Sequence, residues 1–188
     1  PGEVGELVCT KPWPAMTRGI WRDPDRYVDT YWRRFPGVWV HGDWASIDED
    51  GFWFLHGRSD DTLNVAGKRL GPAEVESALA SHPAVAESAA VGVPHEVKGE
   101  TIWCFVVSKP DATPGEELAR ELRAVVADHL GKSFAPERVV FVGELPKTRS
   151  AKIVRRAVRA TALDEDPGDL SSLENPSAID AIRAALSA

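Results

Sequence analysis

Short apolar runs in the first third of the chain predict strands there. Short apolar stretches of the length and composition of strands occur at residues 6–10, 38–41, 44–46 and 52–55. The last two flank the turn-forming sequence Asp-Glu-Asp-Gly at 48–51, which indicates a hairpin. The first part of the chain, residues 1–56, is therefore expected to be rich in β-structure.

The pattern changes in the middle of the chain, where strand-like and helical segments alternate. Residues 63–65 and 68–70 predict a short hairpin, because Gly67 at its turn supplies a positive φ without steric cost. Pro72 then suits the first position of a helix, and acidic residues follow it in the first turns. A helix from Pro72 to about Ser81 is expected.

The rest of the chain continues this alternation. Strands are predicted at 85–93, 100–108 and 138–142, and helices at 114–130, 153–162 and 175–186. Thr113 and Glu116 have the spacing of a capping box, and Gly131 predicts the end of the helix that follows. An acidic linker is expected at 164–168.

The composition narrows the class of protein. The chain has 188 residues, of which 43% are hydrophobic and 27% charged, as in ordinary globular domains. Its formal net charge of -7 disfavours a general binder of nucleic acid or of an anionic membrane. No apolar run approaches the roughly 18 residues that span a bilayer. The five histidines form no zinc-binding motif, so no metal site is expected.

The cysteines indicate a reducing compartment. Cys9 and Cys104 are far apart and outside any CxxC spacing, and Cys104 lies in the apolar run 102–107, where it is expected to belong to the core. No secretory signal is present. These features predict a cytoplasmic protein.

Tryptophans crowd the first 53 residues, at positions 13, 21, 32, 39, 44 and 53. A packed aromatic core is the favoured interpretation, since aromatic side chains usually serve burial. A stacking platform for a carbohydrate or a base is the alternative.

Charged residues gather around the predicted hairpin at 63–70. Arg58 and Arg69 bracket the hairpin, and Asp60 and Asp61 precede it. Charge of this density beside a turn is typical either of a solvated loop or of a site for a polyanionic ligand. The residues alone leave both open.

Three motifs follow one another along the chain. They are Gly-Asp at 42–43, GRSDDTLNVAGKRLGPAEVE at 57–76 and LPKTRSAK at 145–152. In this order and spacing the chain resembles the adenylate-forming enzymes, and among them the AMP-forming acyl-CoA synthetases of the acetyl-CoA synthetase type. The stretch 11–39 also resembles acetyl-CoA synthetases more than luciferases or carrier-protein-loading adenylation domains.

The resemblance implies an α+β fold class with three parts. Residues 1–59 would form the β-rich C-terminal end of a large N-terminal AMP-binding domain. Residues 60–163 would form a small, mobile α+β C-terminal domain with a mixed sheet flanked by helices, and 164–188 a linker and a terminal helix. The chain begins at Pro1 and its only methionine is Met16, so we expect a C-terminal fragment. Its family's phosphate loop and acyl pocket lie upstream, and we expect the isolated chain to be inactive.

The resemblance also implies nucleotide-binding roles for Asp43, Arg58 and Arg69. A carboxylate at a strand end suits the vicinal hydroxyls of a ribose, and an arginine offers a planar fork of donors. For Arg58 the alternative is a surface ion pair with one of the aspartates that follow it. His41 stands where many members of the family have Thr or Ser.

Two further roles follow from the central motif. Asp60 matches the residue about which the family's small domain swivels, one orientation forming the acyl-adenylate and the other the thioester. The hairpin turn with Ala66 and Gly67 matches the place where the pantetheine arm of CoA passes, and a glycine lets a ligand approach the backbone closely. A plain turn glycine and a plain loop aspartate are the alternatives.

Lys152, at the end of the third motif, matches the adenylation lysine of the family. An ammonium between the acid and the α-phosphate would stabilise the charge that develops in the transition state. Ala151 stands where the family usually has Gly. In bacterial relatives this lysine is acylated, so a lysine acyltransferase and a deacylase are expected partners; acetylation would remove the charge. A basic surface loop is the alternative.

The function implied is ligation of a small carboxylic acid, first acetate and then propionate, to CoA with ATP and Mg2+, releasing AMP and pyrophosphate. One alternative keeps the chemistry but uses a larger acid or a carrier-protein acceptor. Another is a non-catalytic recognition module that serves as the substrate of a lysine acyltransferase. The short basic run after Lys152 is a weak indication of nucleic-acid binding in an acidic chain.

Overall fold

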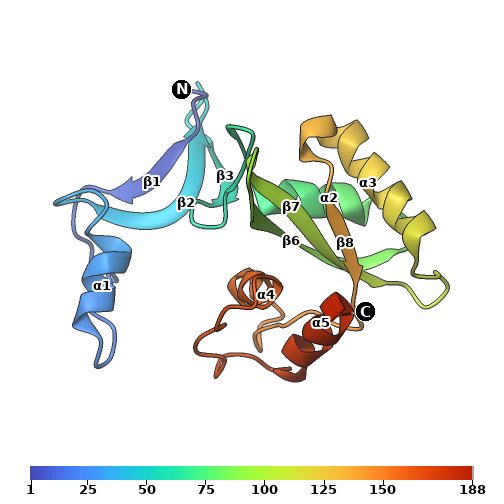
Figure 1. The fold of residues 1–188 in the computed structure, drawn as a ribbon. Coiled ribbons are helices and arrows are strands. Elements are labelled where there is room, and N and C mark those ends of the chain that lie inside the picture. Colours follow the sequence, from blue (N-terminus) through green and yellow to red (C-terminus); the bar gives the residue numbers. More distant parts are fainter. Residues whose placement is uncertain (188) are drawn as a thin grey trace. The chain divides into compact units, whose positions relative to one another are not determined.

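The structure is a computed structural model that describes residues 1–187 and divides them into two compact units. Unit 1 is Pro1–Asp60, and unit 2 begins at Asp61 (Figure 1). Within the described residues, no helix is long and apolar enough to cross a membrane. The assignment of the units to parts of a larger enzyme stays a prediction.

Unit 1 is built on a three-stranded antiparallel sheet with the order β1-β2-β3. The strands are β1 (Gly5–Cys9), β2 (Trp39–Ile47) and β3 (Trp53–Arg58). The segments predicted at 38–41 and 44–46 form the single strand β2, which continues through Gly42 at a φ of +86°. The turn between β2 and β3 lies where it was predicted, and the Asp48 carboxylate accepts hydrogen bonds from two backbone amides in it.

Unit 1 also contains a helix, α1 (Pro24–Tyr31), in a segment where the sequence predicted no element. Asp23 caps it by accepting a hydrogen bond from the Arg26 backbone N–H at 3.1 Å, and Pro24 begins it. None of its residues is fully buried, and its apolar side is short: Tyr27 and Tyr31, four positions apart, contact each other, and Tyr31 stacks on Trp39. An apolar face of only two turns is a weak signal in a sequence. The sequence did not predict this helix, but the unit is otherwise rich in β-structure, as expected.

The tryptophans of unit 1 are divided between the interior and the surface. Trp39 is buried, with its ring stacked on Tyr31 at 5.0 Å and edge-on to Trp13 at 5.2 Å between centroids. Trp21 and Trp53 are 85% and 59% exposed. The packed aromatic core is therefore confirmed around Trp39 and is wrong for these two residues.

Unit 2 contains a mixed sheet flanked by helices, as predicted. Its strands are β4 (Leu63–Val65), β5 (Lys68–Leu70), β6 (Val85–His95), β7 (Gly99–Ser108) and β8 (Arg138–Phe141). The order is β5-β4-β7-β6, and β8 pairs with β7 as the one parallel neighbour in the part of the chain described. The helices are α2 (Pro72–Ala80), α3 (Glu116–Leu130), α4 (Arg155–Ala162) and α5 (Ser177–Ser187), with a short 3-10 turn, Lys132–Phe134, after α3.

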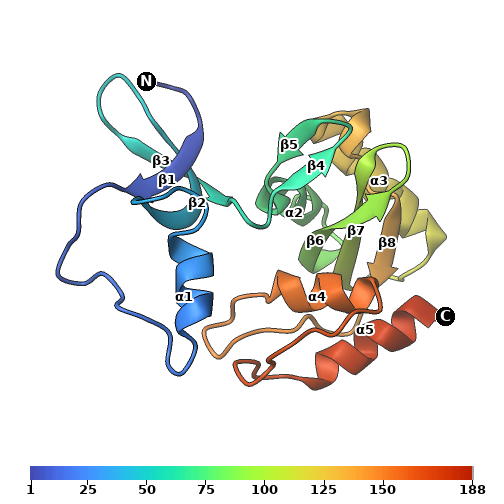
Figure 2. The ribbon, with the colours of Figure 1, turned by 60° about the vertical axis from the view of Figure 1, so that its left-hand side comes forward.

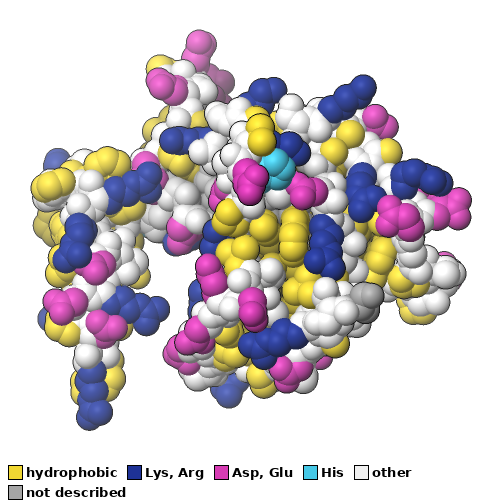
Figure 3. All heavy atoms as spheres, in the orientation of Figure 1, with side chains coloured by type: hydrophobic (Ala, Val, Ile, Leu, Met, Phe, Trp, Pro, Cys, Tyr) yellow, Lys and Arg dark blue, Asp and Glu magenta, His cyan; other side chains and the backbone are white. Residues whose placement is uncertain are grey.

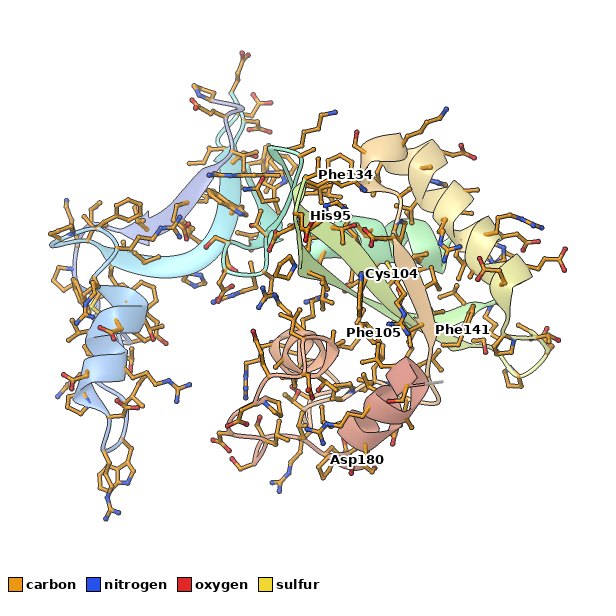
Figure 4. The ribbon with its side chains drawn as sticks, viewed as in Figure 1. His95, Cys104, Phe105, Phe134, Phe141 and Asp180 are labelled. Atoms are coloured by element: carbon orange, nitrogen blue, oxygen red, sulfur yellow. The ribbon has the colours of Figure 1, made fainter. Side chains whose placement is uncertain are left out.

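The helices cover both faces of this sheet, with α2 and α3 on one side and α4 and α5 on the other (Figures 1 and 2). Successive side chains of β7 point to opposite faces of the sheet and contribute to the packing on both. Cys104 packs with residues of α2 and α3, whereas its neighbour Phe105 packs with residues of α4 and α5 (Figure 4). Because β7 is covered on both faces, it reads as a nearly continuous apolar run.

Helix α3 begins later than the capping box would place it. Gly115 is the N-cap and makes no side-chain hydrogen bond, so the pairing predicted between Thr113 and Glu116 is wrong. A capping box needs its Ser or Thr at the N-cap, and here the chain enters the helix two residues further on. The helix ends as predicted at Gly131, whose φ is +98°.

One ion pair joins three elements of unit 2. The Arg155 guanidinium at the start of α4 donates to both carboxylate oxygens of Glu76 on α2, at 2.7 and 2.5 Å. One of these oxygens also accepts from the Ala90 backbone N–H of β6 at 3.0 Å. The two side chains are only 14% and 25% exposed, for Glu76 and Arg155 respectively. The hydrogen bond to Glu76 raises the pKa of Arg155, so the pair stays charged.

Substitution of Glu76 by Gln should lower the free energy of unfolding by about 2–3 kcal/mol, because it leaves a partly buried guanidinium without its main charge partner. Urea denaturation measures this effect. Glu116→Gln is the matched control, since it breaks a 2.8 Å pair with Arg123 in which Glu116 is 82% exposed. The control should change stability by no more than about 0.5 kcal/mol. Equal effects of the two substitutions would contradict the importance of the buried pair.

The buried thiol of Cys104 should make the protein less stable at alkaline pH. Burial raises the pKa of Cys104 far above its ordinary value, and the negative charge of Glu76 adds to this. Because the folded-state pKa is the higher one, the stability is full below the unfolded thiol pKa of about 8.5 and falls above it. The expected loss is about 1.4 kcal/mol per pH unit, measured by urea denaturation from pH 8.5 to 10.5. The Cys104→Ala variant should lose this dependence of stability on pH. If the free energy of unfolding falls as steeply with pH in the variant as in the wild type, the prediction is wrong.

Candidate functional site

The residues proposed for function fall into two groups, one in each unit. Unit 1 carries Asp43 on β2, Arg58 at the end of β3 and Asp60 as its last residue. Unit 2 carries the hairpin turn with Ala66 and Gly67, then Arg69 on β5, and the loop that ends at Lys152.

Strand pairing brings the first group together. Asp43 and Arg58 lie directly opposite each other in the register of β2 and β3. The Arg58 guanidinium donates to both oxygens of Asp60, at 2.8 and 2.7 Å, and lies 3.8 Å from the Asp43 carboxylate. The ion pair considered as the alternative for Arg58 is therefore present, with Asp60 as its partner. The nucleotide-binding role of Arg58 stays a prediction.

Gly42 makes this arrangement sterically accessible. A Cβ added at this position would lie 2.8 Å from a guanidinium nitrogen of Arg58, and the φ of +86° strains any other residue. The guanidinium also donates to the His41 carbonyl at 3.3 Å. The glycine of the Gly-Asp motif is favoured by its positive φ, and the Arg58 side chain, which crosses its backbone, would have to shift to admit a Cβ.

Sequence reasoning missed the role of His41 in this group. Its Nδ1 lies 2.5 Å from the carboxylate of Asp43, whose side chain is 18% exposed. The spacing of two residues on a predicted strand was the signal available in the sequence; the contact itself is formed across Gly42, whose φ is +86°.

Glu6 is a second residue that sequence reasoning missed. Its carboxylate, 8% exposed, accepts a hydrogen bond from Arg34 at 2.7 Å and another from the Ser59 hydroxyl at 2.7 Å. Ser59 immediately precedes Asp60. The backbone that leads into the proposed hinge is thereby attached to β1, a link that no local sequence signal indicates.

The hairpin turn in unit 2 has the geometry of a type I′ turn. Ala66 and Gly67 both have positive φ, at 51° and 77°. A Cβ added at Gly67 would meet no atom within 4 Å, so the turn is open on this side. The Ala66 backbone N–H donates to the Lys98 carbonyl at 2.9 Å, which attaches the turn to the loop before β7. An open backbone held in place is what a passing ligand chain requires.

Lys152 is exposed and lies on the returning side of a narrow loop, opposite Thr148. Its carbonyl accepts from the Thr148 backbone N–H at 2.9 Å, and its own N–H donates to the Thr148 hydroxyl at 3.2 Å. Lys147 and Ile153 close the loop by an antiparallel bridge. Ala151 adopts a left-handed φ of 60°, a conformation that favours glycine.

Both ends of this loop are attached to the body of unit 2. Asn175, before α5, accepts from the Lys147 backbone N–H at 2.8 Å and donates to the Leu145 carbonyl at 3.0 Å. The Lys147 ammonium pairs with Glu87 of β6 at 2.5 Å. At the other end, Arg155 is held by Glu76. Asn175 was read in the sequence only as a helix start, and its role in the loop depends on tertiary contacts.

The basic run after Lys152 is engaged within unit 2. Arg155 pairs with Glu76 and lies 3.7 Å from Asp61, Arg156 donates to carbonyls at 167 and 169, and Arg159 donates to the Gly92 carbonyl at 2.9 Å. On the face shown in Figure 3, basic and acidic side chains are interspersed. These arginines therefore serve to attach α4 and its flanking segments.

Comparison with known proteins gives one consistent result. Residues 74–152 match the family described as AMP-binding enzyme C-terminal domain. The chain is 51% identical over 180 residues to an acetyl-coenzyme A synthetase from Pyrobaculum aerophilum, covering 96% of this chain and 27% of that protein. It is 47% identical to a 3-hydroxypropionyl-coenzyme A synthetase from Sulfurisphaera tokodaii, covering 99% of this chain and 28% of that protein.

Solved structures agree with the sequence relatives. An acetoacetyl-CoA synthetase from Streptomyces lividans superposes with a TM-score of 0.83 at 31% identity, over 98% of this chain and 28% of that one. The chain thus spans little more than a quarter of the length of the curated relatives it matches. Residues 74–152 therefore match the AMP-binding enzyme C-terminal domain, and almost the whole chain is similar in sequence and fold to one part of acyl-CoA synthetases.

Proposed function

We propose that this chain is the C-terminal part of an AMP-forming acyl-CoA synthetase whose first substrate is acetate. The observation that carries the proposal is the exposed Lys152, presented by a loop attached at both ends, at the end of the matched family segment. The chain's close similarity to acetyl-coenzyme A synthetases along almost its whole length supports acetate.

The first half-reaction joins the acid to AMP. A carboxylate oxygen attacks the α-phosphorus of ATP, and the bond to pyrophosphate breaks. The Lys152 ammonium would lie between the acid and the α-phosphate and stabilise the negative charge that develops there. Asp43 would accept hydrogen bonds from the ribose hydroxyls, while Arg58 and Arg69 would donate to the nucleotide.

The second half-reaction transfers the acyl group to CoA. The CoA sulfur attacks the acyl carbon and AMP leaves. The open turn at Gly67 would lie along the pantetheine arm, with Ala66 beside it. Asp60, at the boundary between the two compact units, would be the residue about which unit 2 changes orientation between the two steps.

Mg2+ is proposed to enter with the phosphates of ATP. Among the described residues, no group of three or more His, Cys, Asp or Glu side chains is placed to hold a metal ion. Mg2+ is commonly bound through substrate phosphates and a few carboxylates instead of a full protein cage, so this arrangement suits the metal.

A second candidate substrate is a slightly larger acid such as 3-hydroxypropionate. It is favoured by the similarity to a 3-hydroxypropionyl-coenzyme A synthetase, at 47% identity. Propionate and a carrier-protein acceptor also stay within this proposal. Assay of the full-length protein with each acid and acceptor separates them.

Regulation of the site is part of the same proposal. An exposed lysine in a loop is accessible to a lysine acyltransferase and a deacylase, which we expect in the cytoplasm. Acetylation of Lys152 would remove the charge needed for adenylation. The chain would then also be the recognition module for the modifying enzyme.

Substitution of Lys152 by Ala in the full-length protein should lower acetate-dependent ATP–pyrophosphate exchange by about 100-fold or more, as expected for loss of a group that stabilises the transition state. Thioester formation from preformed acetyl-adenylate should change by less than about threefold. Arg149→Ala is the matched control, because it removes an exposed cation from the same loop and should leave both rates nearly unchanged. If Lys152→Ala leaves exchange intact, the loop is only a basic surface loop.

Substitution of Gly67 by Leu should have the opposite pattern. Thioester formation should fall by about 100-fold because the side chain fills the path of the pantetheine arm, while pyrophosphate exchange should persist. Gly37→Leu is the matched control, since Gly37 has the same φ of +77° and the same open surroundings but lies in unit 1. Equal loss of both half-reactions in Gly67→Leu would contradict the proposed path of CoA.

A further inference from the structure

His41 occupies a supported position on β2, close to Asp43. Along β2, His41 lies between Trp39, whose ring it meets, and Asp43, whose carboxylate it contacts. The rings of Trp39 and His41 meet edge to face, with centroids 5.6 Å apart and an interplanar angle of 70°. The histidine is therefore held between a ring and a carboxylate.

The ring behind His41 is itself fixed. Trp39 is 7% exposed and stacks on Tyr31 of α1 with an interplanar angle of 6°. Trp13, in the segment between β1 and α1, packs edge-on against the Trp39 ring. The aromatic cluster at the start of the chain thus supports the orientation of the His41 ring.

The contact between His41 and Asp43 determines how the carboxylate is oriented. Nδ1 of His41 lies 2.5 Å from Oδ2 of Asp43, while the other oxygen, Oδ1, lies 3.8 Å from Arg58. A carboxylate has about four acceptor positions, and a proton on Nδ1 uses one of them. The remaining positions are sufficient for two hydroxyl donors, and the hydrogen bond prevents free rotation of the group.

We propose that His41 is a positioning residue that orients the Asp43 carboxylate toward the two hydroxyls of a nucleotide ribose. The inference rests on the proposed function, in which Asp43 binds the ribose. It adds a role for a histidine that stands where many members of the resembled family have Thr or Ser. His41 acts through Asp43 and makes no contact with the reacting atoms.

Two substitutions distinguish the hydrogen bond from simple packing. The amide nitrogen of Asn is attached to Cγ, as Nδ1 of histidine is, whereas the amide nitrogen of Gln is one bond further out, as Nε2 is. His41→Asn should therefore keep a donor directed at Asp43, and His41→Gln should not. A role in stability alone would not separate these two variants in this order.

The experiment measures dissociation constants of the full-length protein for ATP and for 2′,3′-dideoxy-ATP, which lacks both ribose hydroxyls. His41→Ala and His41→Gln should weaken ATP binding by about tenfold, the range of one hydrogen bond to a charged group. His41→Asn should stay within about threefold of the wild type. Binding of dideoxy-ATP should change by less than about twofold in all three variants.

His56→Ala is the matched control, because His56 lies on β3 of the same sheet and bonds to Ser46 at 2.8 Å instead of to Asp43. It should leave both constants unchanged. Unchanged ATP binding in His41→Ala, or equal loss in the Asn and Gln variants, overturns the inference. Asp43→Ala tests the proposed function separately: if it does not weaken ATP binding, the ribose site itself is misplaced and the role of His41 fails with it.

Discussion

The ion pair between Glu76 and Arg155 is the interaction on which the arrangement of unit 2 depends. It joins α2, β6 and the start of α4 through two side chains that are largely removed from water. A charge pair in such surroundings is strongly directional, because an arginine and a carboxylate match in only a few geometries. It therefore determines where α4 begins relative to the sheet.

The position of Lys152 follows from this constraint. Lys152 precedes Arg155 by three residues, and its loop is attached at the other end by Asn175 and by the Lys147–Glu87 pair. The lysine can thus be exposed and still be held in a defined place. In an electrostatic mechanism this combination matters, because a charge stabilises a transition state only if it does not have to be reorganised during the reaction.

Local signals predicted much of the fold and of the candidate site. The hairpin at 63–70, the long apolar run of β7 and the end of α3 at Gly131 depend on neighbouring residues, and all three lie where they were expected. The failures have equally physical causes. Helix α1 has only two turns and no fully buried residue, so its apolar face is a weak signal, and α3 begins at a glycine instead of at the Thr that the capping rule selects.

By itself the sequence determined the identity of the motifs, the turn chemistry and most of the elements, because these depend on residues a few positions apart. Only the tertiary structure decided which charges meet. Glu76 and Arg155 are 79 positions apart, Glu6 and Ser59 are 53 apart, and Asn175 reaches back 28 residues to Lys147. The pairing of β2 with β3 placed Arg58 across Gly42, where it bonds to Asp60. Such contacts follow from the packing of whole elements, which no local spacing of residues encodes.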